Sequence, residues 1–363
     1  MEISVHQIQS LRLRGQRLHP RQPILPASVK QLVKDVCGMQ AQEVEAGMLS
    51  IGVRCEAITA GGVSRALVEE RSIVRTWAMR GTLHFVAADA LAWMLPLFGP
   101  RFIRGGRKRR LDLGLDEATG ERGVRLLRDL LGERGPLMKA EIAEALSAKG
   151  IPMAGQASIH LIGLAAMQGW VCYGPLRGKK GSFVLIEDWL GKPLETSVEN
   201  GIEELARRYL AAFAPATVED FASWAGLSIR DCRTAWEIIA SDLFEVKMGN
   251  STVWMLLTQL DMLEDKMANR LVVNLLPRYD TYLLGYTDRS LIIDPEHVKR
   301  IYPGGGLIHP ALLVDGKVAG TWRTDRKRGK VEVEVELFEH LSASVQNELE
   351  AEIKAVSHFL SQD

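Results

Sequence analysis

The spacing of apolar residues along the chain predicts a recurring pattern of three helices followed by a hairpin. Between residues 122 and 146 two amphipathic segments flank a GERGPL turn, and QASIHLIGLAAMQG (residues 156–169) has apolar positions at helical spacing. The next stretch, WVCYGPLRGKKGSFVLIE, predicts two strands joined by a loop rich in glycine and lysine. Three helices followed by a basic hairpin are the plan of a winged-helix unit, in which a helix or the hairpin contacts DNA.

The same pattern recurs on both sides of this stretch. Residues 200–258 predict three helices, with Thr217 as an N-cap, and a hairpin that turns at Gly249 and Asn250. A looser copy at the front has helices around 5–18, 28–37, 43–54 and 62–70. It ends in SIVRTWAMRGTLHFV, a hairpin with Met79-Arg80-Gly81 at its tip. We therefore expect three winged-helix units in tandem.

The pattern of apolar and polar residues changes after about residue 268. Segments such as NRLVVNLLPRYDTYLLGYTD, HPALLVDGKVAGTWRTD and GKVEVEVELFE alternate with period two and are separated by turn residues. They predict a small barrel or sheet of four to six strands, followed by an acidic C-terminal helix. The expected fold class is α+β, divided into residues 1–115, 116–195, 196–265 and 266–363.

Composition narrows the class of protein. The 363 residues are 47% hydrophobic and 25% charged, which is ordinary for a globular protein. The N-terminus lacks the apolar core of a signal peptide, and we find no apolar run long enough for a membrane span. The four cysteines are widely separated, which favours a reducing compartment over a disulfide framework. We expect a cytoplasmic monomer that associates with the nucleoid through DNA and has no membrane partner.

Familiar catalytic motifs are missing from the sequence. There is no P-loop, no HExxH and no GxSxG, and the eight histidines are dispersed, so we expect neither a metal nor a cofactor. His84 lies in a predicted strand, where a structural role is favoured over a catalytic one.

Positive charge is concentrated in the front third of the chain. Through Gly114 there are 17 Lys and Arg against 9 Asp and Glu, although the whole chain is neutral. Residues 101–110 (RFIRGGRKRR) and 322–330 (WRTDRKRGK) are strongly basic and lie near glycines. They predict phosphate-binding loops; the alternative is solvated loops whose charge serves solubility.

The segment Gln40-Ala41-Gln42 is the candidate for chemistry. Residues i and i+2 do not share a face of a helix, so joint action of the two glutamines needs an extended backbone. Gly38 is a plausible end for the preceding helix, and a new one can begin at Glu43. The alternative is a polar connection between two helices.

Four blocks in order, QAQ, RTWAMRGTLHFV, LLPRYDTYLLGYTDRS and VDGKVAGTWR, resemble the AlkZ/YcaQ family of winged-helix DNA glycosylases across nearly the whole chain. The resemblance implies three tandem winged helices in a C shape with a C-terminal β-domain. It also implies excision of N-alkylated purines from double-stranded DNA, including the unhooking of interstrand crosslinks. The family signature is Q-x-Q in the AlkZ branch and Q-x-D in the YcaQ branch, so Gln40 and Gln42 place this chain with the former.

Two neutral amides suit this chemistry. An N7-alkylated guanine is already cationic and leaves without a general acid, so the site has only to hold a water below the anomeric carbon and tolerate an oxocarbenium-like transition state. The alternative function is a non-catalytic winged-helix DNA-binding protein or transcription regulator. The expected DNA contacts are Arg80, Lys179, Lys180, Arg278, Asp288, Arg289, Arg323, Arg326, Lys327 and Arg328.

The block around Asp280 has two interpretations. Arg278 and Arg289 lie close in sequence to Asp280 and Asp288, which predicts two surface ion pairs, each worth under about 1 kcal/mol. In the functional alternative, Asp288 orients Arg289 at the duplex backbone, and Asp280 is either part of the scaffold or a carboxylate that stabilises the oxocarbenium ion.

Overall fold

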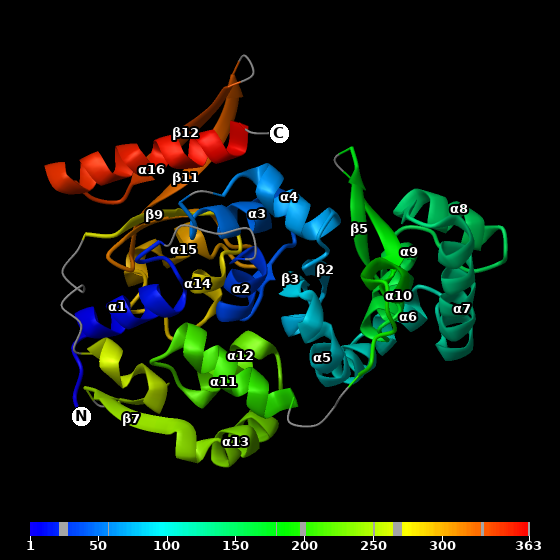
Figure 1. Ribbon diagram of the computed structural model, residues 1–363, viewed down its shortest axis with the longest axis horizontal. Helices are drawn as coiled ribbons and strands as arrows, with labels where there is room; N and C mark the ends of the chain where they lie inside the picture. The colour runs from blue at the N-terminus through cyan, green and yellow to red at the C-terminus, as the bar shows by residue number, and fades with distance from the viewer. Residues whose placement is uncertain are drawn as a thin grey trace. The chain divides into compact units, whose positions relative to one another are not determined.

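The computed structural model describes residues 1–21, 28–56, 58–178, 180–196, 201–249, 251–263, 271–327 and 330–361. The chain divides into two compact units, Met1–Ser64 with Ile202–Asp363, and Arg65–Gly201 (Figure 1). This division is coarser than the four predicted parts and cuts across residues 1–115; the four-part division stays a prediction. None of the described helices is both long and apolar enough to cross a membrane.

The first unit begins with helices and ends with a sheet. Its elements, including α4 and α11 at its boundaries, are α1 (Val5–Gly15), α2 (Ser28–Asp35), β1 (Met39–Gln40), α3 (Val44–Gly52), α4 (Ala60–Val68), α11 (Gly201–Phe213), α12 (Val218–Ala225), α13 (Ile229–Ile238), β7 (Leu243–Met248), β8 (Ser251–Leu256), β9 (Val273–Leu276), α14 (Thr281–Leu284), α15 (Val298–Ile301), β10 (Ala311–Val314), β11 (Lys317–Lys327), β12 (Lys330–Leu337) and α16 (Ala343–Ser361).

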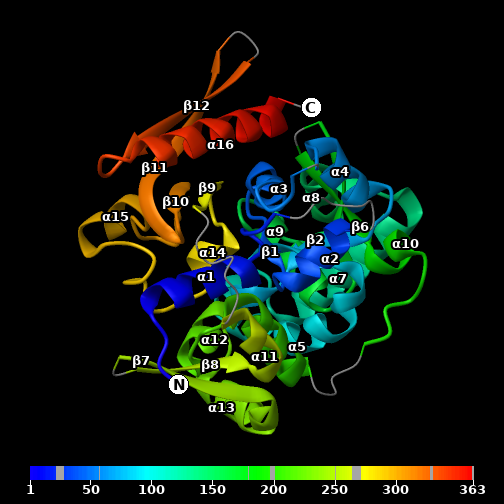
Figure 2. The ribbon, with the colours of Figure 1, turned by 60° about the vertical axis from the view of Figure 1, so that its left-hand side comes forward.

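Four antiparallel strands of this unit form a sheet in the order β12-β11-β10-β9. Helix α16 packs against β9 and β12, and it lies alongside the sheet in both views (Figures 1 and 2). The strand number agrees with the predicted four to six. The helical part of the unit has a core of aromatic rings from α11 and α12, in which Tyr209 stacks on Phe213 and both meet the tilted ring of Trp224. Thr217 caps α12 as predicted, accepting from the Asp220 amide.

The second unit holds the elements between these two parts of the chain. They are β2 (Ile73–Trp77), β3 (Leu83–Ala87), α5 (Leu91–Gly105), α6 (Arg107–Asp112), α7 (Glu117–Arg134), β4 (Leu137–Met138), α8 (Lys139–Ser147), α9 (Ala157–Met167), β5 (Val171–Arg177), β6 (Lys180–Leu185) and α10 (Ile186–Leu190).

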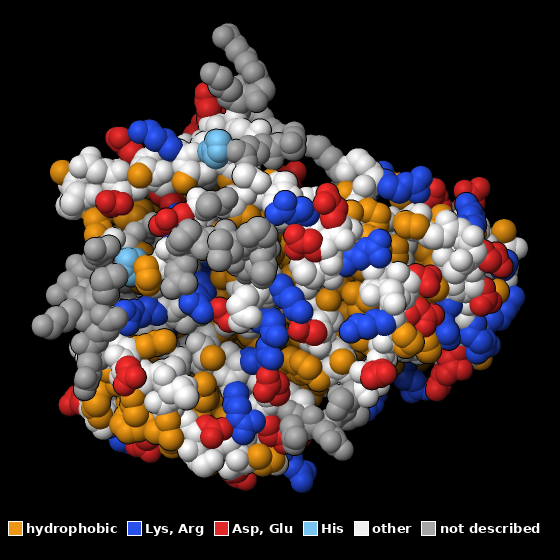
Figure 3. Space-filling model, in the orientation of Figure 1, with side chains coloured by type: hydrophobic (Ala, Val, Ile, Leu, Met, Phe, Trp, Pro, Cys, Tyr) orange, Lys and Arg blue, Asp and Glu red, His pale blue; other side chains and the backbone are white. Residues whose placement is uncertain are grey.

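The core of the second unit is built by α7, α8 and α9 together with the hairpin β5–β6. The short strand β4 pairs with β6, so the sheet order is β4-β6-β5. Leu127, Ile142, Leu161 and Phe183, one from each of the three helices and one from β6, are almost fully buried together. Over α7 and α8, at the right of Figure 3, Lys and Arg side chains alternate with Asp and Glu, so the charges on this face are mixed.

Two predicted elements are wrong. Residues 101–110 were expected to be a basic loop, but they belong to helices α5 and α6, because Gly106 keeps right-handed helical torsions at their junction. The alternating segment at 269–288 is predicted to contribute to the sheet along its length. In its described part, residues 271–288, the strand is Val273–Leu276, and Asp280 then caps the short helix α14 by accepting from the Tyr282 amide. A local cap overrides the period-two pattern there.

Candidate active site

The QAQ segment is a non-helical connection between α2 and α3, in which Gln40 ends a short strand and Gln42 lies in a bend. After α2, the Gly38 amide donates to the Val33 carbonyl at 2.8 Å, and Cys37 and Gly38 both have positive φ, which ends the helix. Strand β1 then covers Met39 and Gln40, and α3 begins at Val44 with the extended residue Glu43 as its N-cap. The helix ends at Asp35, three residues before the predicted stop at Gly38, and the non-helical backbone at Gln40 is confirmed.

The two glutamines differ in their access to solvent. Gln40 is 7% exposed and Ala41 between them is fully buried, whereas Gln42 is exposed. The buried alanine anchors the connection, and the glutamine on its exposed side can meet a large substrate. Nearby Cys37 is no candidate nucleophile, since burial raises the pKa of its thiol to about 12 and keeps it protonated at neutral pH.

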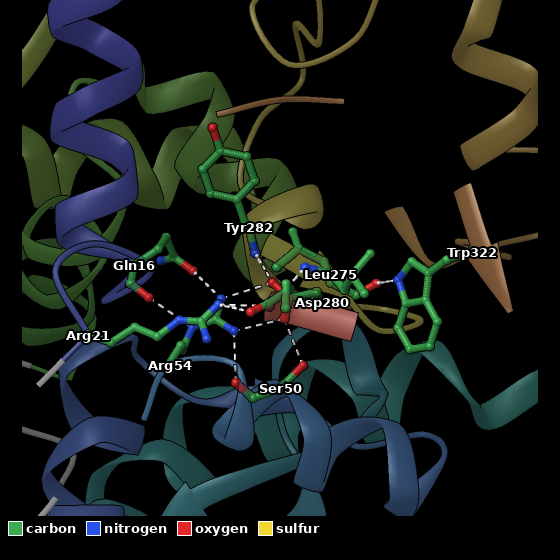
Figure 4. Close-up of polar contacts among 10 residues, drawn as sticks. Gln16, Arg21, Ser50, Arg54, Leu275, Asp280, Tyr282 and Trp322 are labelled. Carbon is green, nitrogen blue, oxygen red and sulfur yellow. Dashed lines mark hydrogen bonds and ion pairs between the residues drawn. The ribbon is translucent and has the colours of Figure 1, made fainter. Parts of the chain in front are cut away.

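A buried ion pair anchors the helix that follows the glutamines (Figure 4). Arg54, just beyond α3, donates from Nη1 to Oδ2 and from Nη2 to Oδ1 of Asp280, both at 2.8 Å, and both side chains are 0% exposed. Ser50 of α3 donates to the same carboxylate at 2.8 Å. The Arg54 Nε donates to the Gln16 carbonyl at 2.8 Å. One carboxylate therefore joins α1, α3 and α14.

The loop from Pro277 to Asp280 holds α3 near both of its ends. Arg278 donates to Glu43, the N-cap of α3, at 3.1 Å, while Asp280 contacts Ser50 and Arg54 at the far end. Tyr279 between them has a φ of 59°, a left-handed conformation that is costly for a bulky residue. The left-handed residue separates the surface contact of Arg278 from the buried contact of Asp280.

These contacts correct the ion pairs expected from sequence. Asp280 pairs with Arg54 rather than Arg278, and the pair is buried rather than on the surface. Asp288 accepts from the Ser290 amide, and the Arg289 guanidinium lies 4.0 Å from the centre of the Tyr302 ring. Sequence reasoning missed Arg54, Ser50 and Gln16. The one available signal was an arginine in the otherwise apolar run LSIGVRC.

A second buried contact fixes α16 against the sheet. Arg21 donates to Glu352 of α16 at 2.7 Å, and the same carboxylate accepts from the Leu275 amide of β9 at 3.1 Å. Trp322 of β11 donates from its indole to the Leu276 carbonyl at 2.8 Å (Figure 4). The sheet edge next to the Pro277–Asp280 loop is thereby held from two sides.

Apart from Arg278, Asp288 and Arg289, which are described above, the predicted DNA contacts fall into three groups. Lys180 and Arg323 are exposed; Arg323 is 80% exposed and pairs with Glu334 at 2.6 Å. Arg80 is half-buried, and burial lowers its pKa to about 10, which leaves it charged at neutral pH. The third group, Lys179, Arg326, Lys327 and Arg328, lies outside the residues or side chains that the structure describes.

The histidines give no sign of a catalytic role. His84 is 2% exposed, its Nδ1 lies 3.0 Å from the Thr82 carbonyl, and burial lowers its pKa to about 3, so it is neutral. Within the described ranges, Glu296, His297 and Glu339 are the only group close enough together to hold a metal ion. Two of these three are exposed acids, and His297 stacks on Phe338 at 4.2 Å, so we assign no metal there.

Comparison with known proteins identifies the class of this protein as a DNA glycosylase. The chain belongs to the AlkZ-like DNA glycosylase family, whose sequence model matches residues 33–359. It is 30% identical over 342 residues to an interstrand DNA cross-link repair glycosylase of Streptomyces sahachiroi, covering 89% of this chain and 88% of that protein. The structure of Streptomyces sahachiroi DNA glycosylase AlkZ matches with a TM-score of 0.81 and 25% identity, covering 98% of this chain and 97% of that one. The protein is therefore an enzyme that acts on DNA.

Proposed function

We propose that this glycosylase hydrolyses the N-glycosidic bond of N7- or N3-alkylated purines in double-stranded DNA, with Gln40 and Gln42 holding the attacking water. The observation that carries the proposal is the non-helical QAQ connection, in which Gln42 is exposed to solvent and Gln40 is held in the protein. Because the Streptomyces sahachiroi relative is an interstrand DNA cross-link repair glycosylase, we extend the proposal to the unhooking of such crosslinks.

The reaction needs little from the protein beyond correct placement of the attacking water. The bond from C1′ to N9 breaks with its electron pair passing to a base that is already cationic, and the base leaves neutral. Water then adds to C1′ and loses its proton to solvent. Amide oxygens of Gln40 and Gln42 accept hydrogen bonds from that water and fix its approach. They place no negative charge against the sugar cation, so labile cationic lesions are favoured over neutral ones.

We further propose that the chain contains three winged-helix units and acts as a monomer. The order α7, β4, α8, α9, β5, β6 and the sheet β4-β6-β5 support this for the middle unit. Helices α11, α12 and α13 followed by β7 and β8 repeat the helical triad and hairpin. The hairpins β2–β3 and β5–β6 would contact phosphates through Arg80 and Lys180, together with the predicted cations Lys179, Arg326, Lys327 and Arg328. Arg278 and Arg323 are each paired with a glutamate instead.

The first experiment tests the glutamines. DNA carrying N7-methylguanine is incubated with wild-type protein, Gln40→Ala and Gln42→Ala, and alkali-labile abasic sites are measured under single-turnover conditions. Each substitution should lower excision by about tenfold or more while duplex affinity stays within about threefold, since positioning acts on the chemical step. Gln42→Asp is expected to retain activity, because a carboxylate can also hold water and stabilises the cation. If both alanine variants excise the base at the wild-type rate, the glutamines only connect the two helices and the proposed role is wrong.

A non-catalytic regulator is the competing function. It predicts DNA binding without abasic sites on any alkylated duplex. Wild-type protein that binds the N7-methylguanine duplex and leaves it intact would therefore replace the proposed reaction with this alternative.

A further inference from the structure

A groove opens in the first unit immediately beyond the glutamines. It has a volume of about 730 Å³, and its walls include Glu45, Ala46, Leu49, Pro277, Trp322 and Val335. Glu43, which also lines it, is joined to Gln42 by a peptide bond, so the two Cα atoms are about 3.8 Å apart. We call this the α3 groove, because α3 forms the wall nearest the glutamines.

The charges of the α3 groove do not suit a phosphate backbone. Four glutamates line it, at positions 43, 45, 334 and 336, against two arginines, at positions 278 and 323. Three of the glutamates have arginine partners: Glu43 with Arg278, Glu334 with Arg323, and Glu336 with Arg300. Glu45 has no ion-pair partner among the described residues. After these pairings the groove keeps one carboxylate that no described residue compensates, which suits a cationic group better than a phosphate backbone.

Apart from these charges and the polar side chains of His309, Thr321 and Thr324, its walls are apolar, and its size is that of a small-molecule site. Leu49, Pro277, Trp322 and Val335 offer aliphatic and aromatic surface, and pockets of roughly 300–1,000 Å³ enclose drug-sized ligands. A methyl group on a base would leave this space empty. A large substituent on the same base, anchored at the glutamines, would enter it.

We propose that the α3 groove receives the non-base part of a bulky lesion and favours apolar or aromatic substituents that carry a protonated amine. This inference rests on the proposed glycosylase reaction and specifies its substrate class. The apolar walls bury the substituent, and the unpaired carboxylate of Glu45 meets the ammonium group. The α3 groove then selects adducts by their size and by their positive charge, close to Gln42.

The test uses three duplexes that differ only in the N7 substituent of one guanine: methyl, benzyl, and aminomethylbenzyl. Single-turnover excision is compared as kcat/KM. We expect the aminomethylbenzyl adduct to exceed the methyl adduct by about tenfold or more, as burial of an aromatic ring allows. The benzyl adduct should fall between them. Benzyl adducts excised no faster than the methyl adduct overturn the inference, whereas absence of excision on all three duplexes refutes the glycosylase reaction itself.

Two variants locate the effect in the groove. Glu45→Gln should lower the ratio of aminomethylbenzyl to benzyl excision about threefold, the size expected for one partly exposed charge pair. Glu348→Gln, which removes an exposed carboxylate from α16 outside the groove, is the matched control and should leave that ratio unchanged. Ala46→Phe fills the groove and should lower the ratio of benzyl to methyl excision about tenfold.

Measuring the affinity of Ala46→Phe for undamaged duplex tests whether the duplex, rather than the lesion substituent, occupies the groove. If Ala46→Phe weakens binding of undamaged DNA as much as it slows benzyl excision, the duplex itself lies in the groove and the inference is wrong. An unchanged benzyl-to-methyl ratio in Ala46→Phe overturns it as well.

Discussion

Substitution of Asp280 by asparagine tests the scaffold that supports the glutamines. The asparagine cannot accept from both Arg54 nitrogens, and it leaves a guanidinium with 0% exposure beside an amide. Loss of one partner from a buried ion pair costs about 3–5 kcal/mol in the free energy of unfolding. For a unit of this size we expect the Tm to fall by about 10 °C.

The assay is thermal melting, followed by circular dichroism, set beside single-turnover excision well below the Tm. Asp288→Asn is the matched control, because Asp288 is exposed and accepts only a local bond from the Ser290 amide; its Tm should stay within about 1 °C of wild type. Since Asp280 holds Ser50 of α3, excision by Asp280→Asn should also fall, by about tenfold, through displacement of Gln42.

The two readouts separate the possible roles of Asp280. A Tm within about 2 °C of wild type would refute the assignment of the Arg54 pair as a main anchor of the unit. A large loss of Tm with normal excision would restrict Asp280 to the scaffold. Because both oxygens of this carboxylate are engaged and buried, its direct contact with an oxocarbenium ion is disfavoured.

Three further predictions concern packing, pH and salt. Gly99→Ala should destabilise the second unit by about 2 kcal/mol, because its Cβ would lie 2.2 Å from the Met167 carbonyl oxygen; Gly105→Ala in the same helix meets nothing within 4 Å and should be neutral in thermal melting. The low pKa of His84 predicts that stability is full above pH 6.5 and declines by up to about 1.4 kcal/mol per pH unit as the pH falls towards 3. In denaturant titrations His84→Asn should show a shallower decline, and an unchanged slope would contradict the assignment. Lys180→Ala should weaken binding to all duplexes alike and reduce the salt slope by about one; an unchanged slope would place the duplex elsewhere.

Local rules in the sequence determined most of the helices and hairpins. Apolar spacing placed α7, α8 and α9, and capping placed the start of α12 at Thr217, because these signals act within a few residues. Gly38 marked the end of α2 to within three residues. The same local rules exposed the QAQ connection as a candidate site. They failed at residues 101–110, where two adjacent glycines suggested a loop although each fits a helical backbone there.

Only the tertiary structure decided what holds and surrounds the glutamines. Arg54 and Asp280 lie 226 residues apart, and the sequence neighbours of Asp280 pointed to Arg278 instead. The α3 groove likewise combines α3 with β11, β12 and the Pro277–Asp280 loop. Such contacts depend on which faces the folded chain brings together, and spacing along a single sequence does not encode partners at that separation.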